Sequence, residues 1–140
     1  MTVSRIDFSA LHFLVIEENS FVRDLICGML RGFGVTHLRE AASIDAGMAD
    51  IDHHPPDIIL CDWMMKPTDG LLFLRKLRAG PGGSYAHALV IMISEHASSD
   101  HVLAALGEGA DSYIVKPFRA ATLLSHLVQA VTGQKVQLAD

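Results

Sequence analysis

The sequence predicts an α/β fold in which a five-stranded parallel sheet is covered by helices on both faces, giving three layers. Short, unbroken apolar runs alternate with longer amphipathic segments along the whole chain. A strand that is apolar throughout is buried on both faces, which is typical of parallel sheets in α/β proteins. The 140 residues correspond to one ordinary domain, and half of them are hydrophobic, which is enough to form a core.

The first half of the chain contains the first three strands and two helices. The strands are expected at 11–16, 36–40 and 58–61, and the second of these patterns is the weakest. Apolar residues on one stripe from 22 to 33 predict the first helix, and Gly34 follows where a left-handed residue would end it. The next helix is expected to begin at Ser43 and to end before Pro55.

The second half continues the same alternation. Short apolar runs and i, i+3, i+4 spacing predict strands at 89–93 and 112–115 and helices at 71–78, 99–106 and 120–131. Gly133 is the expected stop of the last helix. We therefore predict one domain over 8–133, with a short extension over 1–7 and a frayed tail over 134–140.

Charge and hydropathy exclude several classes of function. The chain has 11 Lys and Arg against 16 Asp and Glu, a net charge of -5 with neutral histidines, and no run of basic residues. Sequence-independent binding to nucleic acid or to an anionic membrane needs clustered cations, so neither partner is expected. No apolar run approaches the ~20 residues of a membrane span, and the run at 11–16 is too short for a secretory signal.

The two cysteines and the eight histidines show no spacing typical of a metal site. Cys27 and Cys61 lie inside apolar runs, and we predict buried, reduced thiols in a cytoplasmic protein. No histidines are spaced for a metal site on one helix face, and each histidine is expected at the surface or in a loop.

Polar residues gather at one edge of the predicted sheet. In open parallel sheets the ligand site lies beyond the carboxyl ends of the strands. The residues that follow strands one, three, four and five are, in that order, Glu17 with Glu18, Asp62, Ser94 and Lys116. The fold would therefore bring three carboxylates, one hydroxyl and one ammonium group together.

This set of groups is suited to phosphoryl transfer. Neighbouring carboxylates repel one another, and a hard cation with oxygen ligands, of which Mg2+ is the best fit, relieves that repulsion. A carboxylate can then act as the nucleophile that accepts a phosphoryl group. The Lys116 ammonium can pair with one phosphoryl oxygen, and the Ser94 hydroxyl can donate a hydrogen bond to another.

Five blocks of sequence together resemble the receiver domains of response regulators. The blocks are Leu14–Asn19, Ile59–Trp63, Asp69-Gly70, Ile93-Ser94 and Tyr113–Phe118. The resemblance runs from about residue 11 to 132, nearly the whole chain. It implies a flavodoxin-like sheet with strand order 2-1-3-4-5 and five helices.

The family implies a role for each residue of the acidic site. Asp62 resembles the phosphoacceptor, and Lys116 resembles the phosphate-binding lysine. Glu17 and Glu18 resemble the acidic pair that holds Mg2+ together with Asp62, and the backbone carbonyl of Met64 would be a further ligand. The product of phosphorylation would be an aspartyl phosphate on Asp62.

The resemblance also assigns residues to a conformational switch. Ser94 resembles the hydroxyl that moves toward the phosphate, and Tyr113 resembles the aromatic residue that turns inward behind it. Pro117 follows Lys116, and in the family that peptide bond is usually cis. Edge packing of Tyr113 and a helix-start role for Pro117 are the alternatives.

The chain departs from the family pattern at the metal site and in the following loop. The acidic pair is usually Asp-Asp or Glu-Asp, and the longer Glu18 side chain predicts weaker or rearranged Mg2+ binding. Lys66 holds the place where the family usually has a proline, and Pro67 comes one residue later. We therefore expect a different turn in this loop.

Three residues are candidates for setting the lifetime of the phosphate. Met64 and His96 occupy the two positions that tune this lifetime in the family, and Glu95 replaces a residue that is usually small. Met64 offers no hydrogen bond to an attacking water, which favours slow self-dephosphorylation. His96 is the alternative, because its imidazole can support a water.

The predicted function is that of a phosphoacceptor signalling module in a two-component phosphorelay. The signal would pass through the face built from the helix at 99–106, the strand at 112–115 and the last helix. No output domain is expected after that helix, so the output is another protein or a homodimer formed through this face. The upstream partner would be a histidine kinase or a histidine phosphotransfer protein. No turnover is expected beyond Mg2+-dependent self-phosphorylation and autodephosphorylation.

Two other classes of function are alternatives to this one. A receiver-like binding module with weak or no phosphorylation is favoured by the Glu-Glu pair, the displaced proline and Glu95. A flavin-binding protein would need a phosphate loop rich in Ser, Thr and Gly after the first strand. A phosphatase of the haloacid-dehalogenase type would need a second Asp where Met64 stands.

Overall fold

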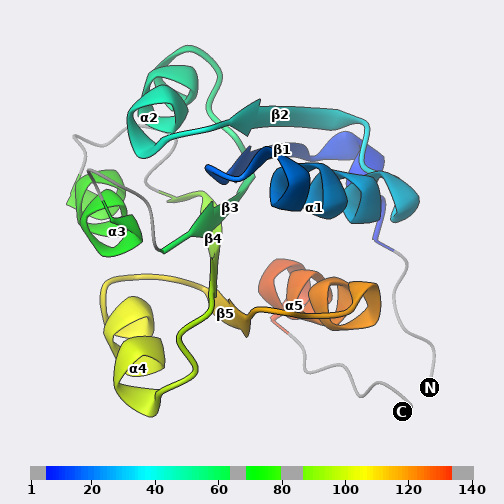
Figure 1. The fold of residues 1–140 in the computed structure, drawn as a ribbon. Coiled ribbons are helices and arrows are strands. Elements are labelled where there is room, and N and C mark those ends of the chain that lie inside the picture. Colours follow the sequence, from blue (N-terminus) through cyan, green and yellow to red (C-terminus); the bar gives the residue numbers. More distant parts are fainter. Residues whose placement is uncertain (1–5, 64–68, 80–86, 134–140) are drawn as a thin grey trace.

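One sheet of five parallel strands organises the protein, which we describe from a computed structural model covering residues 6–63, 69–79 and 87–133 (Figure 1). The strand order is β2-β1-β3-β4-β5. The strands are β1 (His12–Ile16), β2 (His37–Ala41), β3 (Ile58–Asp62), β4 (Leu89–Ser94) and β5 (Ser112–Val115). The predicted doubly wound fold and its strand order are confirmed.

Five helices cover the two faces of this sheet. They are α1 (Ser20–Gly32), α2 (Ile44–His53), α3 (Gly70–Ala79), α4 (Ser99–Gly107) and α5 (Ala120–Thr132). Figure 1 shows α1 and α5 on one face and α2, α3 and α4 on the other. A short 3-10 helix at Phe8–Ala10, which no pattern in the sequence indicates, precedes β1. Among the described residues, none of the helices is long and apolar enough to cross a membrane.

Alternate residues of each strand point to opposite faces, so the sheet separates two hydrophobic cores. In β1, Phe13 and Val15 pack with α1 and α5, whereas Leu14 and Ile16 pack with α2 and α3. All five residues of β3 are buried. This burial on both faces explains why the strands appear in the sequence as unbroken apolar runs.

Local side-chain chemistry sets the helix ends. Asn19, Ser43 and Ser98 precede α1, α2 and α4, and each side-chain oxygen accepts a hydrogen bond from an amide of the first turn. Gly34 and Gly133 have φ angles of 98° and 71°. Both glycines therefore adopt the left-handed conformation that was predicted after the first and last helices.

The start of α3 lies directly against the end of β3. The Gly70 amide donates a hydrogen bond to the Trp63 carbonyl at 2.9 Å. A Cβ atom at Gly70 would lie 3.1 Å from the Asp62 carbonyl oxygen and 2.5 Å from the Met92 methyl carbon. Only glycine leaves room for this contact, which holds the backbone that carries Asp62.

Substitution of Gly70 by alanine is therefore expected to lower the free energy of unfolding by roughly 1–3 kcal/mol, the usual cost of overpacking. Gly28→Ala is the matched control, because a Cβ there meets nothing within 4 Å and the site lies inside α1. The control should gain up to about 1 kcal/mol from helix propensity. Urea unfolding measures both changes, and equal stability of Gly70→Ala and the wild type would contradict the proposed contact.

Candidate functional site

A pocket of about 560 Å³ opens at the carboxyl ends of the strands. Its described lining residues come from segments far apart in the sequence: Glu17, Glu18, Asn19, Val22, Asp62, Glu95, His96 and Lys116. Of the residues predicted for the acidic site, the structure brings Glu17, Glu18, Asp62 and Lys116 to this pocket. Met64 lies outside the described residues, as do Lys66 and Pro67.

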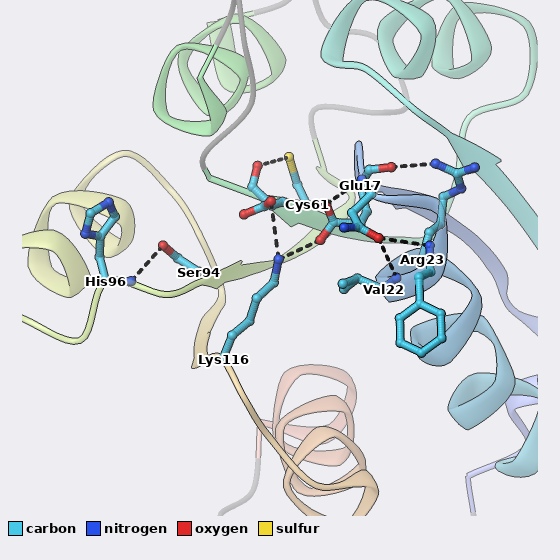
Figure 2. Close-up of polar contacts among 10 residues, drawn as sticks. Glu17, Val22, Arg23, Cys61, Ser94, His96 and Lys116 are labelled. Atoms are coloured by element: carbon cyan, nitrogen blue, oxygen red, sulfur yellow. Dashed lines mark hydrogen bonds and ion pairs between the residues drawn. The ribbon is translucent and has the colours of Figure 1, made fainter.

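Lys116 is the centre of the polar contacts in this pocket (Figure 2). Its ammonium donates a hydrogen bond to Glu17 Oε1 at 2.6 Å and lies 3.3 Å from Asp62 Oδ2. Burial lowers the pKa of Lys116, but the hydrogen bond to Glu17 and the charges of Asp62 and Glu17 outweigh that effect and raise it overall. The ammonium is therefore charged at neutral pH and balances part of the acidic charge.

Glu17 is held in place by both its side chain and its backbone. Its side chain is almost completely buried, and Oε2 accepts a hydrogen bond from the Asn19 amide at 3.2 Å. Its backbone carbonyl accepts a hydrogen bond from Arg23 Nη1 at 2.7 Å. Glu18, by contrast, is exposed at the rim of the pocket. The two neighbouring glutamates thus differ in how freely their carboxylates can move.

The donor atoms of this site are of the kind that Mg2+ binds. Glu17, Glu18 and Asp62 offer only carboxylate oxygens, which select a hard cation. In the part of the chain that the structure describes, no three acidic, histidine or cysteine side chains converge to form a ready metal site. The chemistry of the residues therefore fits the ion, whereas the resting side chains are arranged around Lys116 instead.

Ser94 and Tyr113 both bond to the backbone of His96. The Ser94 hydroxyl oxygen accepts a hydrogen bond from the His96 amide at 3.1 Å. The Tyr113 hydroxyl donates one to the His96 carbonyl at 2.7 Å, and the tyrosine side chain is buried. Figure 2 shows the Ser94 hydroxyl turned toward His96 and away from Lys116. The Lys116–Pro117 peptide bond is cis, which confirms that expectation.

Sequence reasoning missed a cluster of rings beside the pocket. The His96 and His101 rings stack at 4.3 Å, and His101 lies edge-on to Trp63 at 5.4 Å. Elsewhere, His126 is half-buried in α5, and its Nδ1 bonds to the Ser112 hydroxyl. Burial lowers the pKa of His126. Residues 96 and 101 span a helix start, so no periodic pattern in the sequence indicates their contact.

The two cysteines are buried and form no disulfide, as predicted. Burial raises the pKa of Cys27 to about 11 and raises that of Cys61 well above its usual value. Both thiols therefore stay protonated and poorly reactive at neutral pH. Neither contributes a nucleophile to the pocket, although Cys61 directly precedes Asp62.

Comparisons with known proteins identify the family of this chain and several of its relatives. A family model described as the response regulator receiver domain matches residues 13–128. Chemotaxis protein CheY-3 of Vibrio cholerae is 30% identical over 114 residues, which cover 81% of this chain and 86% of that protein. The phosphate regulon transcriptional regulatory protein PhoB of Klebsiella pneumoniae is 29% identical over 118 residues, covering 84% of this chain and 50% of that protein.

Solved structures share the same fold. The CheX-CheY-BeF3-Mg2+ complex from Borrelia burgdorferi matches with a TM-score of 0.80 and 23% identity, covering 87% of this chain and 90% of that chain. NtrX from Brucella abortus matches with a TM-score of 0.78 and 27% identity, covering 88% of this chain and 27% of that chain. The chain therefore belongs to the response regulator receiver domain family of two-component systems, whose members are phosphoacceptor signalling modules.

Proposed function

We propose that this protein is phosphorylated on Asp62 and signals through a change in its surface. The observation that carries the proposal is the ion pair between Asp62 and Lys116 at the edge of an open pocket. Asp62 is largely buried at the end of β3, but its side chain keeps 11% of its exposure and lines the open pocket. A carboxylate in this position is both reachable by a phosphodonor and paired with a cation that can neutralise the incoming charge.

The reaction follows from these positions. A carboxylate oxygen of Asp62 attacks the phosphorus of a phosphohistidine on a histidine kinase or histidine phosphotransfer protein. The P–O bond to Asp62 forms, the P–N bond breaks, and the leaving imidazole takes up a proton. Lys116 stabilises one phosphoryl oxygen as a point charge. No other turnover is proposed beyond self-phosphorylation from small donors and loss of the phosphate to water.

Glu17, Glu18 and Asp62 would hold Mg2+, with the Met64 carbonyl as the further ligand proposed from the family. The ion would supply positive charge against the carboxylates and the phosphoryl oxygens. The CheX-CheY complex of Borrelia burgdorferi, which shares this fold, was solved with BeF3 and Mg2+. In the resting structure, Lys116 supplies part of this charge balance through its hydrogen bond with Glu17.

The switch would act through His96. A phosphoryl group adds roughly -1.5 to -2 charge and three acceptor oxygens. The Ser94 hydroxyl would then exchange the His96 amide for a phosphoryl oxygen, which releases a bond that holds the His96 backbone in the resting structure. Tyr113 is bonded to the carbonyl of the same residue, so the two switch residues would respond together.

The proposed output surface is the α4-β5-α5 face, formed by those three elements. Its large apolar side chains are partly exposed: Leu103 at 66%, Leu106 at 42% and Val115 at 37%. Exposed apolar side chains that lie together can form the core of a protein-binding site, with polar residues at its rim. The partner is an output protein or a second copy of this chain.

We further propose a domain over 8–133 and a cytoplasmic location.

The lifetime of the phosphate stays a prediction. Glu95 and His96 both line the pocket, whereas Met64 lies outside the described residues. We propose slow self-dephosphorylation because the Met64 side chain cannot orient an attacking water. His96 would instead favour faster dephosphorylation, since its position in the lining of the pocket allows it to support an attacking water.

A second candidate function is a receiver-like binding module that is not phosphorylated. The engagement of both Glu17 carboxylate oxygens by Lys116 and Asn19 favours it, because these bonds compete with metal binding. The α4-β5-α5 face would then bind its partner constitutively. Direct measurement of phosphorylation separates the two functions.

Incubation with a small phosphodonor and Mg2+ is expected to add one phosphoryl group to the wild type and none to Asp62→Ala. Intact-protein mass spectrometry measures the addition. Asp52→Ala, at an exposed position of α2, is the control and should be labelled like the wild type. A folded wild type that gains no mass would favour the binding module. Labelling of Asp62→Ala would show that another residue is the phosphoacceptor.

Glu18→Asp is expected to bind Mg2+ more tightly than the wild type, because the shorter side chain places the carboxylate where the family's usual aspartate would hold the ion. Trp63, the only tryptophan of the chain, follows Asp62 and reports the titration by fluorescence. Glu95→Asp makes the same change at another exposed glutamate of the pocket and should leave the affinity unchanged. Equal affinity of Glu18→Asp and the wild type would remove Glu18 from the proposed ligand set.

Lys116→Met is expected to lower the free energy of unfolding by roughly 1–3 kcal/mol at pH 8, because the buried Glu17 carboxylate loses its donor. The hydrogen bond to Glu17 and the nearby carboxylates raise the pKa of Lys116 above its ordinary value in the folded state, so the contribution is complete below the ordinary pKa and is lost as pH rises through the folded pKa. Urea unfolding in a pH series that rises from 8 into the alkaline range should therefore show the difference shrinking. Lys76→Met, on the exposed face of α3, should stay within about 0.5 kcal/mol of the wild type. A difference that grows with pH would contradict the ion pair.

A further inference from the structure

A chain of three aromatic rings connects the end of β3 with the start of α4. Trp63 lies edge-on to His101, with ring centroids 5.4 Å apart and planes at 65°. His101 stacks on His96 at 4.3 Å with planes within 6° of parallel. The three residues come from the segment after β3, the first turn of α4 and the segment before it. We call this arrangement the aromatic bridge.

One end of the bridge is fixed beside the proposed phosphoacceptor. Trp63 directly follows Asp62 and is buried. Its amide donates a hydrogen bond to the Ile93 carbonyl at 3.1 Å, and its carbonyl accepts one from Gly70 at 2.9 Å. The Trp63 ring therefore has little freedom to move independently of β3 and β4.

The other end of the bridge is the residue that both switch side chains hold. The His96 amide donates to the Ser94 hydroxyl, and the His96 carbonyl accepts from the Tyr113 hydroxyl. Its ring lies on that of His101. The position of the His96 segment therefore depends on contacts from β4, β5 and α4 at once.

His101 is the middle ring and is itself oriented by the helix cap. Its Nδ1 lies 2.5 Å from the Ser98 hydroxyl oxygen, and Ser98 is the N-cap of α4. The ring thus projects from the first turn of α4 between Trp63 and His96. A movement of the His96 segment would be transmitted through this ring to the beginning of the helix.

We propose that His101 is a positioning residue that couples the Asp62 end of β3 to α4 through its ring contacts. It does not line the phosphoacceptor pocket described above; it acts through His96 and Trp63. In the resting protein it holds the His96 segment in the arrangement that bonds Ser94 and Tyr113. The part of this inference that concerns signalling rests on the proposed phosphorylation of Asp62, whereas the resting coupling does not.

The first test uses the unphosphorylated protein and site-resolved amide hydrogen exchange by NMR. His101→Ala removes the ring, and His101→Phe keeps a flat ring but loses the nitrogen bonded to Ser98. Loss of the stacking contact with His96 is expected to speed exchange of the His96 amide about three- to tenfold. Exchange of the Leu60 amide in β3 should not change, and His101→Phe should behave like the wild type.

His37→Ala is the matched control. His37 stacks on His12 with ring centroids also 4.3 Å apart, at the opposite edge of the sheet. Removing this ring should leave the His96 amide unaffected. Three results would overturn the proposal: unchanged His96 exchange in His101→Ala, equal acceleration at His96 and Leu60, or exchange in His101→Phe as fast as in His101→Ala.

The second test follows the signal after treatment with a small phosphodonor and Mg2+. The amide shift of Val102, which donates to the Ser98 carbonyl in the first turn of α4, reports movement of the helix start. At equal phosphorylation by mass, His101→Ala should show at most half of the wild-type shift, and a full shift would overturn the coupling. If the wild type accepts no phosphoryl group, the proposed function fails, and the exchange experiment still decides the role of His101 in the resting protein.

Discussion

The ion pairs between Lys116 and the carboxylates of Glu17 and Asp62 place three charged groups at one poorly solvated edge of the sheet. Buried charges are costly unless they are paired and hydrogen-bonded, so these groups constrain one another. Lys116 and Glu17 are 99 residues apart in sequence. The parallel sheet brings these charged groups together because β1, β3 and β5 end at the same edge.

The neighbouring elements hold these charged groups in place. Gly70 brings α3 against the backbone of Asp62, and the cap of α1 follows directly after the acidic pair. The two cores on either side of the sheet keep the strands rigid, whereas the polar pocket stays open to solvent. The Asp62 carboxylate is thus carried by a strand that is buried along its whole length.

The surroundings of His96 give the site a route to the surface. Ser94 and Tyr113 hold its backbone, and His101 holds its ring. These contacts join β4, β5 and α4, and the same three elements border the exposed apolar side chains Leu103 and Val115. Under the proposed phosphorylation, a change in charge at Asp62 would reach the proposed α4-β5-α5 face through these contacts.

The sequence by itself determined the fold class, the strands and the edge at which polar residues gather. Strands buried on both faces must be apolar throughout, and the ends of parallel strands meet at one edge, so local patterns were sufficient. The helix stops at Gly34 and Gly133 were equally local. The tertiary structure alone decided that Glu17 bonds to Lys116, that the Ser94 hydroxyl turns toward His96, and that the His101 ring lies between two other rings, stacked on His96 and edge-on to Trp63. Side-chain orientation depends on neighbours from distant segments, and hydropathy and spacing carry no information about those contacts.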